Sequence, residues 1–382
     1  MPIITGEGFS GKSAIAALLI ARLLLVGAIV VIADNSPGSL IGVDTGRYWS
    51  IATSEGDHYR DFPVEYPPVA VAQIEATKGG SVQELGRNLS VLSFVFDVVT
   101  AIALAVGWGR LAAVIYLWLG LMVAPIVYPM IEPSVIAFAV LGLLAVKKGK
   151  DVLGGGLLAL ASFVKVWPVV VIPLLWQRGK RAAALAMAGF GAVGLAVWIA
   201  YWGSDAPIQV LTFRGAEGWE ISSMVGSLLR LLTELPTAMS EGAYRLGDVS
   251  AAARAALLAA TLITVLVAGH LGRGGPEGPV LVTCVAALLT FSPLGSPQFG
   301  LWLLPFVAMC SHRAILWAGA VVAFLTTILL YVWSTIEVDP GAPLDLLALA
   351  KNLAILALGV ISFRVLLTDR RLTQPEPVSS VP

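Results

Sequence analysis

Long apolar runs are the feature that most limits how this chain can fold. A helix that crosses a membrane needs about 20 apolar residues, and the clearest runs of that kind are 14–33, 89–107, 111–128, 182–202, 251–271, 313–334 and 344–367. Shorter apolar runs cover 132–146, 279–294 and 299–310. Only 13% of the 382 residues are charged, about half the share of about 25% in soluble domains. The chain is therefore predicted to be an all-α polytopic membrane protein rather than a soluble enzyme.

Two basic clusters set the predicted orientation of these helices. Lys147-Lys148-Gly149-Lys150 and Arg178-Gly179-Lys180-Arg181 are the densest, and short basic loops stay in the cytoplasm. Residues 152–176 lie between them, so this stretch must enter the membrane and return, with a break near 163–168. Each arm has about 12 residues and a length of roughly 18 Å, whereas the hydrocarbon core is about 30 Å thick. The tip, which carries Lys165, is expected below the outer surface.

The remaining basic loops agree with an orientation that places both ends of the chain in the cytoplasm. This arrangement predicts about 12 crossings. They form one transmembrane domain, 1–367, with two long outer loops, 34–88 and 203–250, that carry interfacial helices. Residues 368–382 are expected to form a disordered cytoplasmic tail, because their end is rich in Pro and Ser.

The first outer loop holds the largest group of polar and aromatic side chains in the chain. Residues Asp44 to Ile51 read D-T-G-R-Y-W-S-I, and their spacing suits a helix that starts near Asp44, where the helix dipole favours an anion. Tyr and Trp in this segment suit the headgroup level of a membrane. Further along, Pro67-Pro68 can stop one helix and begin another at its first turn.

The charge balance and the cysteines exclude several classes of function. Lys and Arg total 24 and Asp and Glu total 24, so the net charge is 0. Nucleic acid is not an expected partner, because it needs a basic surface. Cys284 and Cys310 both lie in apolar runs, where cysteine acts as a small hydrophobic residue. They offer neither a disulfide framework nor a thiolate metal site.

The N-terminal string Gly6-Glu7-Gly8-Phe9-Ser10-Gly11-Lys12-Ser13 matches the pattern of an ATP-binding phosphate loop. Such a loop needs a strand before it and a soluble helix packed on a sheet after it. Here an apolar span follows, so ATP is not an expected partner. No cofactor and no metal are predicted, although Asp44, Asp57 and Asp61 could hold calcium in the first outer loop.

Four stretches of the chain together resemble one known family. They are Asp44 followed by Tyr48-Trp49; Tyr59-Arg60-Asp61-Phe62-Pro63-Val64-Glu65-Tyr66-Pro67-Pro68; Leu160-Ala161-Ser162-Phe163-Val164-Lys165-Val166-Trp167-Pro168, with the basic end Arg178-Gly179-Lys180-Arg181; and Ser296-Pro297-Gln298-Phe299-Gly300-Leu301-Trp302-Leu303-Leu304-Pro305. The pattern resembles the GT-C superfamily of glycosyltransferases. The closest likeness is to the bacterial, largely actinobacterial, α-mannosyltransferases that use polyprenyl-phosphate-mannose. One position departs from it, because Ser222 stands where related proteins often carry a carboxylate.

This resemblance implies a GT-C fold and a transfer reaction on the outer face of a bacterial plasma membrane. A sugar, in the first instance mannose, would pass from a polyprenyl-phosphate donor to an envelope glycolipid or glycan. In the family, the acidic residue of the first outer loop is the general base that takes the proton of the attacking hydroxyl, a role that maps to Asp44. The donor, the acceptor and membrane lipids are the expected partners.

Two further groups of residues are expected at this site. Cations would hold the donor phosphate, because Arg and Lys bind phosphate oxygens, and the topology alone places Lys165 for this task. The candidates for the phosphate are Lys165, Arg47, Arg60, Arg214 and His58. The candidates for other contacts with the substrates are Tyr48, Glu65, Tyr66, Glu220, Gln298 and Trp302.

Three charged residues lie inside the predicted spans. Charged side chains at membrane depth are costly and are usually paired. Asp97 is therefore expected to form an ion pair with Arg22 or with Lys351.

Two alternative functions remain open at this level. The donor could carry arabinofuranose or another pentose, or the chain could be a transporter or flippase of a lipid-linked sugar. Transporters tend to have two related halves with broken helices in matching positions. Here only one half has the short hairpin 152–176, which favours an enzyme.

Overall fold

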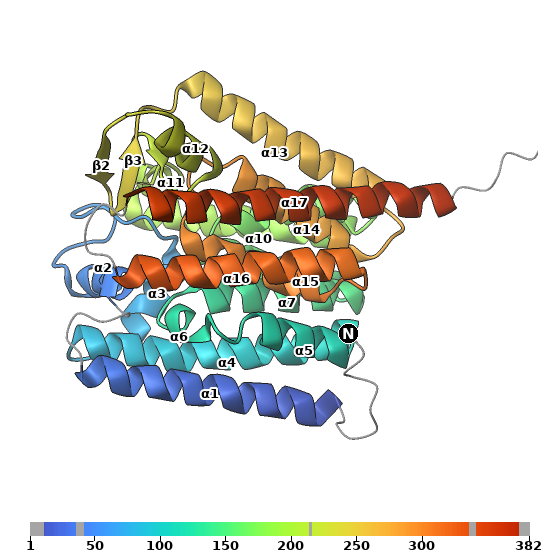
Figure 1. Ribbon diagram of the computed structural model, residues 1–382, viewed down its shortest axis with the longest axis horizontal. Helices are drawn as coiled ribbons and strands as arrows, with labels where there is room; N and C mark the ends of the chain where they lie inside the picture. Colours follow the sequence, from blue (N-terminus) through green and yellow to red (C-terminus); the bar gives the residue numbers. More distant parts are fainter. Residues whose placement is uncertain (1–10, 36–41, 214–215, 336–340, 374–382) are drawn as a thin grey trace, which may run out of the picture.

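The computed structural model describes residues 11–35, 42–213, 216–335 and 341–373. Most of the longer helices lie side by side along the long dimension of the molecule (Figure 1). The helices are α1 Gly11–Asn35, α2 Gly42–Thr53, α3 Pro68–Ala76, α4 Val82–Trp108, α5 Arg110–Leu119, α6 Ala124–Val127, α7 Glu132–Lys147, α8 Asp151–Ser162, η1 (a 3-10 helix) Trp167–Val170, α9 Val171–Gln177, α10 Arg181–Trp202, α11 Asp205–Leu211, α12 Met224–Leu232, α13 Ala251–Leu271, α14 Glu277–Thr290, η2 (3-10) Pro297–Leu303, α15 Leu304–Ala308, α16 Arg313–Thr335 and α17 Gly341–Thr373. The strands are β1 Trp219–Glu220, β2 Thr237–Ser240 and β3 Ala243–Leu246.

Six helices of the described residues are long and apolar enough to cross a membrane, namely α1, α4, α10, α13, α16 and α17. The predicted spans 182–202 and 251–271 coincide with α10 and α13 to within one residue. These helices confirm a polytopic, predominantly α-helical membrane protein. The other predicted spans are occupied by shorter helices, so the total of about 12 crossings stays a prediction.

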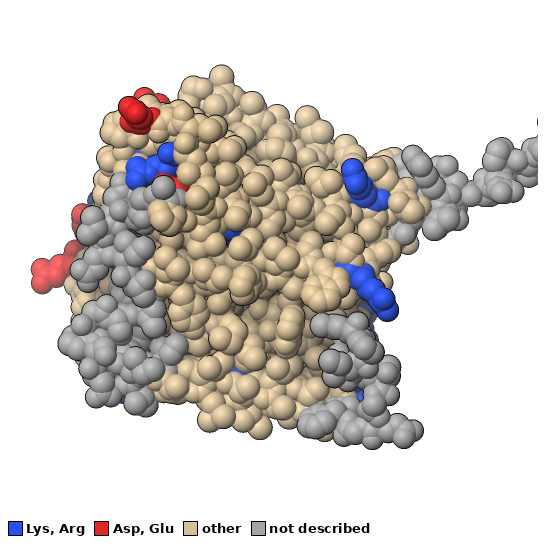
Figure 2. Space-filling view, in the orientation of Figure 1, with Lys and Arg blue, Asp and Glu red and all other residues tan. Residues whose placement is uncertain are grey.

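The surface of the bundle supports the same conclusion. Large apolar side chains such as Leu24, Phe190 and Leu258 are more than half exposed. Figure 2 shows a face whose middle is almost entirely uncharged, with charged side chains gathered at the two ends. Contiguous apolar surface of this kind is unfavourable in water and suits contact with lipid chains.

The predicted single span 111–128 is wrong in one respect, because α5 already stops at Leu119. Arg22 of α1 lies across the end of α5. Its guanidinium donates to the Leu117 carbonyl from Nε at 3.1 Å and from Nη2 at 2.7 Å, and to the Tyr116 carbonyl at 3.1 Å. The Leu117 carbonyl belongs to the last helical turn and lacks an intrahelical partner, whereas the Tyr116 carbonyl also accepts from the Gly120 N–H at 3.1 Å. A side chain at position 120 would clash with the guanidinium, so Gly120 makes room for Arg22.

Asp97 of α4 balances the charge of Arg22 at this point. Its carboxylate lies 2.5 Å from Arg22 Nη1 and accepts hydrogen bonds from the hydroxyls of Tyr116 and Tyr128, each at 2.6 Å. The expected pairing of Asp97 is thereby resolved in favour of Arg22. Lys351 instead donates to the Ser222 carbonyl at 3.4 Å.

Short helices turn back within the bundle, and the predicted hairpin 152–176 is one of these places. α8 ends at Ser162 and η1 begins at Trp167, so the break near 163–168 is confirmed. The backbone N–H groups of Val69 and Ala70 in the first turn of α3 donate to the Phe163 carbonyl at 3.0 and 3.3 Å. Pro68 begins α3, as the paired prolines predicted. The start of α3 therefore holds the hairpin tip in place.

Smaller elements cover one end of the bundle, at the left of Figure 1, called the outer end below. α2, α3, α11, α12 and the strands lie there, and α1 begins and α17 ends at the opposite, inner end. The three strands form an antiparallel sheet in the order β1-β3-β2, with Trp219 opposite Leu246 and Glu220 opposite Arg245. This small sheet within 203–250 is an addition to the all-α prediction.

The C-terminal boundary also differs from the expected one. α17 continues to Thr373, so residues 368–373 of the predicted tail are helical. Residues 374–382 lie outside the described part of the chain, as does most of the string Gly6–Ser13.

Candidate active site

Asp44 lies in the first turn of α2, at the outer end of the bundle, and is half-buried. Its Oδ2 accepts a hydrogen bond from Gln298 Nε2 at 3.2 Å. The Gln298 side chain is itself oriented by Ser296, whose hydroxyl donates to Oε1 at 2.5 Å. Two segments more than 250 residues apart in sequence are thus joined at one carboxylate. The helix dipole also favours an anion at this position.

The surroundings of Asp44 make its carboxyl unusually easy to protonate. Burial raises its pKa to about 7, and the nearby carboxylate of Glu132 adds to the increase. Lys165 acts in the opposite direction and lowers the pKa. At neutral pH the Asp44 carboxyl is therefore divided between its charged and neutral forms, as a group that accepts and releases protons should be.

Lys165 and Glu132 form a buried ion pair beside Asp44. Lys165 Nζ contacts Glu132 Oε1, and the two side chains are 13% and 0% exposed. The second oxygen of Glu132, Oε2, has no hydrogen-bond partner among the described residues. Lys165 Nζ also lies 5.0 Å from the Phe299 ring centre and 5.6 Å from that of Trp302. An ammonium over aromatic faces is stabilised by the ring electrons, so the rings and Glu132 together hold the Lys165 side chain in place.

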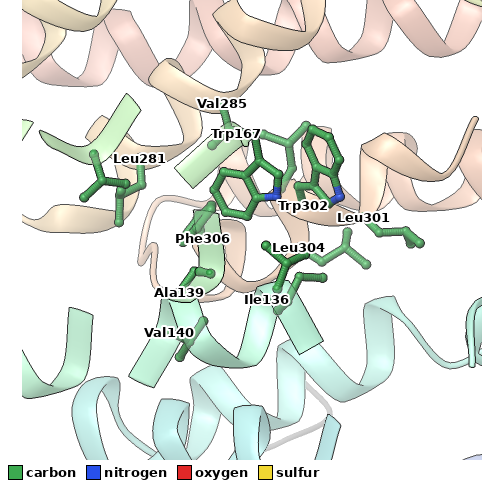
Figure 3. Close-up of a cluster of buried hydrophobic side chains, with 14 of the residues drawn as sticks. Ile136, Ala139, Val140, Trp167, Leu281, Val285, Leu301, Trp302, Leu304 and Phe306 are labelled. Atoms are coloured by element: carbon green, nitrogen blue, oxygen red, sulfur yellow. The ribbon is translucent and has the colours of Figure 1, made fainter. Parts of the chain in front are cut away.

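A stack of aromatic rings forms one wall of the site. Trp302 lies nearly parallel to Phe299, with 4.3 Å between ring centres, and to Trp167 of η1 at 5.5 Å. Figure 3 shows the two tryptophans beside one another, above Phe306 and the aliphatic side chains of α7. Trp167 and Trp302 are each only 5% exposed and belong to the hydrophobic core, so the stack is a rigid support for Lys165.

Arg47 forms a two-pronged ion pair with Glu65, and its side chain is 27% exposed. The guanidinium donates to Glu65 Oε1 at 2.9 Å and to Oε2 at 2.7 Å, and Arg47 Nη2 also donates to the Pro63 carbonyl at 2.8 Å. The two tyrosines expected at the site pack edge to face, with 5.5 Å between the ring centres of Tyr48 and Tyr66. Burial raises the pKa of both hydroxyls. Arg47 and Tyr48 of α2 are thus packed against Glu65 and Tyr66, which fixes the position of α2.

Glu220 of β1 contributes a fourth carboxylate near Asp44. Its Oε2 accepts from the Gly295 backbone N–H at 3.1 Å and its Oε1 from the Ser222 hydroxyl at 3.4 Å. Ser222 also donates to the Gly295 carbonyl at 2.6 Å. Ser222, at the position where a carboxylate was expected, therefore ties β1 to the loop that leads to Gln298.

Other predicted residues are not brought to this cluster. His58 lies 3.4 Å from Glu75, and Arg60 is half exposed and lies 3.7 Å from Asp57. Arg214 lies outside the described residues. Within the described ranges no group of three acidic, His or Cys side chains is arranged to hold a metal ion.

Glu132 is the residue of this cluster that the sequence interpretation missed. It was treated as the first residue of the short apolar run 132–146, directly before Pro133. The available signal was its charge within a membrane segment, because such residues are rare and usually functional. Its partner Lys165 had been singled out by the same argument.

Two apolar cavities follow α13 from the outer end into the bundle. One, of about 240 Å³, has Arg245 and Arg254 among its lining residues. The other, of about 320 Å³, lies further along α13 against α14 and α17. Both include Phe291. The first also includes Pro293, whose carbonyl accepts a hydrogen bond from the Glu220 N–H at 3.1 Å. The two cavities are therefore neighbours along α13, and the smaller one adjoins the backbone of Glu220.

Comparison with known proteins decides the class of the chain. The sequence model of glycosyltransferase family 87 matches residues 66–297, which is more than half of the chain. The chain belongs to glycosyltransferase family 87. Together with its apolar helices, this membership makes it a membrane glycosyltransferase and sets aside the transporter alternative.

The family 87 match covers part of the site described above. Glu132, Lys165 and Glu220 lie within residues 66–297, and Asp44 and Gln298 lie outside them. No curated protein matches the chain.

Proposed function

We propose that this family 87 protein transfers mannose from a polyprenyl-phosphate donor to an envelope glycolipid or glycan. The reaction takes place at the outer end of the bundle, on the extracytoplasmic face of a bacterial plasma membrane, with both chain ends in the cytoplasm and a GT-C fold. The observation that carries the proposal is the half-buried carboxyl of Asp44, with a pKa of about 7, beside the cation Lys165. The choice of mannose rests on the four sequence stretches that resemble the mannosyltransferases.

The partners of the four carboxylates favour Asp44 as the general base. Glu65 holds Arg47, and Glu132 holds Lys165. Glu220 accepts from a backbone N–H of the loop that it supports. Asp44 accepts from the neutral Gln298, so it can take the proton of an attacking hydroxyl without breaking an ion pair. A positioned base of this kind accelerates transfer by about 10²- to 10⁴-fold.

Lys165 is suited to the leaving phosphate. A lipid phosphate departs as an anion and needs a cation rather than an acid. Lys165 donates one hydrogen bond to Glu132. An ammonium has three donor hydrogens, so Lys165 can contact a phosphate oxygen as well. Among the described cations predicted for the phosphate, Lys165 is the one whose charge acts on the Asp44 carboxyl.

The two cavities along α13 support a donor carried by a lipid. The apolar walls of the larger cavity suit a prenyl chain, because an apolar chain gains about 0.8 kcal/mol for each CH₂ that leaves water. Arg245 and Arg254 of the smaller cavity suit a phosphate. Pro293 lines the smaller cavity and accepts a hydrogen bond from the Glu220 N–H, so a phosphate bound there would lie next to the site.

The pH dependence of transfer tests the role of Asp44. We expect kcat/KM to rise about tenfold per pH unit up to about pH 7 and to level off above it, because only the ionised carboxylate accepts a proton. Glu132→Gln should shift this limb to lower pH, since Glu132 raises the pKa of Asp44. Rates of wild type and variant across the pH range check both points. If the rising part of the pH profile stays in place or moves to higher pH in Glu132→Gln, Asp44 is not the group that titrates.

The donor is tested with purified protein in lipid and radiolabelled polyprenyl-phosphate-mannose, offered with a mixture of envelope glycolipids. We expect a labelled, longer glycolipid. The matched assay uses polyprenyl-phosphate-arabinose at the same concentration. Product with arabinose alone would replace mannose by a pentose as the transferred sugar, and product with neither donor would overturn a polyprenyl-phosphate sugar as substrate.

A further inference from the structure

A small basic cavity lies at the inner end of the bundle, at the opposite end from Asp44. It has a volume of about 110 Å³ and is formed where α7, α9 and α14 meet. Half of its lining residues are aliphatic side chains of these helices. The other half are charged, namely Lys147, Arg178, Lys180, Arg273 and Glu277. The cavity therefore contains four cations and one carboxylate.

The single carboxylate is already matched by one of the cations. Glu277 Oε2 lies 3.2 Å from Lys147 Nζ and accepts a hydrogen bond from Trp108 Nε1 at 2.8 Å. Lys147 Nζ also lies 5.2 Å from the centre of the Trp108 ring. Lys147 therefore balances the charge of Glu277. The other three cations of the cavity, Arg178, Lys180 and Arg273, have no matching carboxylate in its lining.

Arg178 has neutral partners. Its Nη1 donates to the Gly272 carbonyl at 2.5 Å and its Nη2 to the Gly275 carbonyl at 2.7 Å, which fixes the turn between α13 and α14. Burial lowers the pKa of Arg178, and Glu277 only partly opposes this effect. Lys180 is half-buried and Arg273 exposed, and neither has an ionic partner among the described residues. The cavity has an excess of positive charge.

We propose that this cavity binds the phosphate of an anionic phospholipid in the inner leaflet. Two of its cations flank helices long and apolar enough to cross a membrane, because Lys180 directly precedes α10 and Arg273 follows the end of α13. Basic pockets at the ends of such helices bind anionic lipid heads. The aliphatic residues suit the glycerol and first carbons of the lipid. The three cations without a matched carboxylate suit its phosphate.

The test measures lipid binding to the full-length protein. The protein is prepared in phosphatidylcholine nanodiscs and titrated with phosphatidylglycerol, and the bound lipid is counted by native mass spectrometry. The double variant Lys180→Gln/Arg273→Gln should weaken binding of phosphatidylglycerol by about tenfold or more, because each cation near an anionic lipid contributes substantially. Arg178 is left in place, because it holds the α13–α14 turn.

The matched control is Lys148→Gln/Lys150→Gln. It removes the same charge from the same end of the bundle, and both side chains are exposed and outside the cavity. Binding should stay within about twofold of wild type, since exposed charges interact weakly. An equal loss in both double variants would replace the cavity by a diffuse surface effect. Saturation of the site by inorganic phosphate alone, or equal binding of phosphatidylcholine, would overturn an anionic lipid as the ligand.

Discussion

Replacing Asp44 by asparagine is expected to slow sugar transfer by about two to four orders of magnitude, the range that a general base supplies. Asparagine has nearly the same shape, and its side-chain oxygen can accept the hydrogen bond that Gln298 donates to Asp44 at 3.2 Å. The position of α2 should therefore be kept while the ability to take a proton is lost. Transfer rates at saturating donor and acceptor, one pH unit above the pKa of about 7, measure the change in kcat.

The matched control for this variant is Asp57→Asn. Asp57 also belongs to the outer segment between α1 and α4, but its side chain is 68% exposed and lies 3.7 Å from Arg60. Its loss should leave the transfer rate within about twofold of wild type, since exposed ion pairs contribute little. An Asp44→Asn protein that folds and transfers at the wild-type rate would remove Asp44 from the mechanism and make Glu65 the next candidate.

Charge and length arguments were enough to predict the part of the fold that carries Lys165. Two basic clusters enclosed a stretch too short to cross the membrane twice, so its tip had to lie inside. The structure places the break between Ser162 and Trp167 and Lys165 against a buried carboxylate. Apolar run length likewise gave α10 and α13 nearly to the residue. These features are local, and local sequence determines them.

Features that depend on distant contacts were not predictable in the same way. Glu132 and Lys165 are 33 positions apart and meet only when α7 packs against the hairpin. Arg47 was assigned to a phosphate because nothing in its neighbourhood showed that Glu65, 18 positions later, would take its guanidinium. The last turn of α5 is contacted by Arg22, 95 positions away from Leu117. Such pairs are set by tertiary packing, which a single sequence does not display.

Breaking the Arg22–Asp97 ion pair is expected to destabilise the bundle strongly, because it leaves a buried charge without a partner. Both side chains are 3% exposed. Asp97→Asn keeps the volume of the side chain but leaves the Arg22 charge without a counterion, and breaking a buried pair in this way costs about 3–5 kcal/mol. The free energy of unfolding, measured by reversible denaturation in mixed micelles, should fall by that amount. The exposed Asp57→Asn variant should change it by less than about 1 kcal/mol.

Arg22 both pairs with Asp97 and donates hydrogen bonds to the end of α5. A double variant separates the effect of the ion pair from the effect of these hydrogen bonds. Arg22→Met/Asp97→Leu removes both charges, so the cost of an unmatched ion disappears. The Leu117 carbonyl, which accepts from Arg22 Nε and Nη2, would then lack a donor inside an apolar region, at about 1–3 kcal/mol for a buried unsatisfied group. The double variant should therefore regain part of the stability lost in Asp97→Asn, but not all of it. Full recovery would mean that α5 ends at Leu119 without help from Arg22, and no recovery would mean that the hydrogen bonds, rather than the charge balance, dominate.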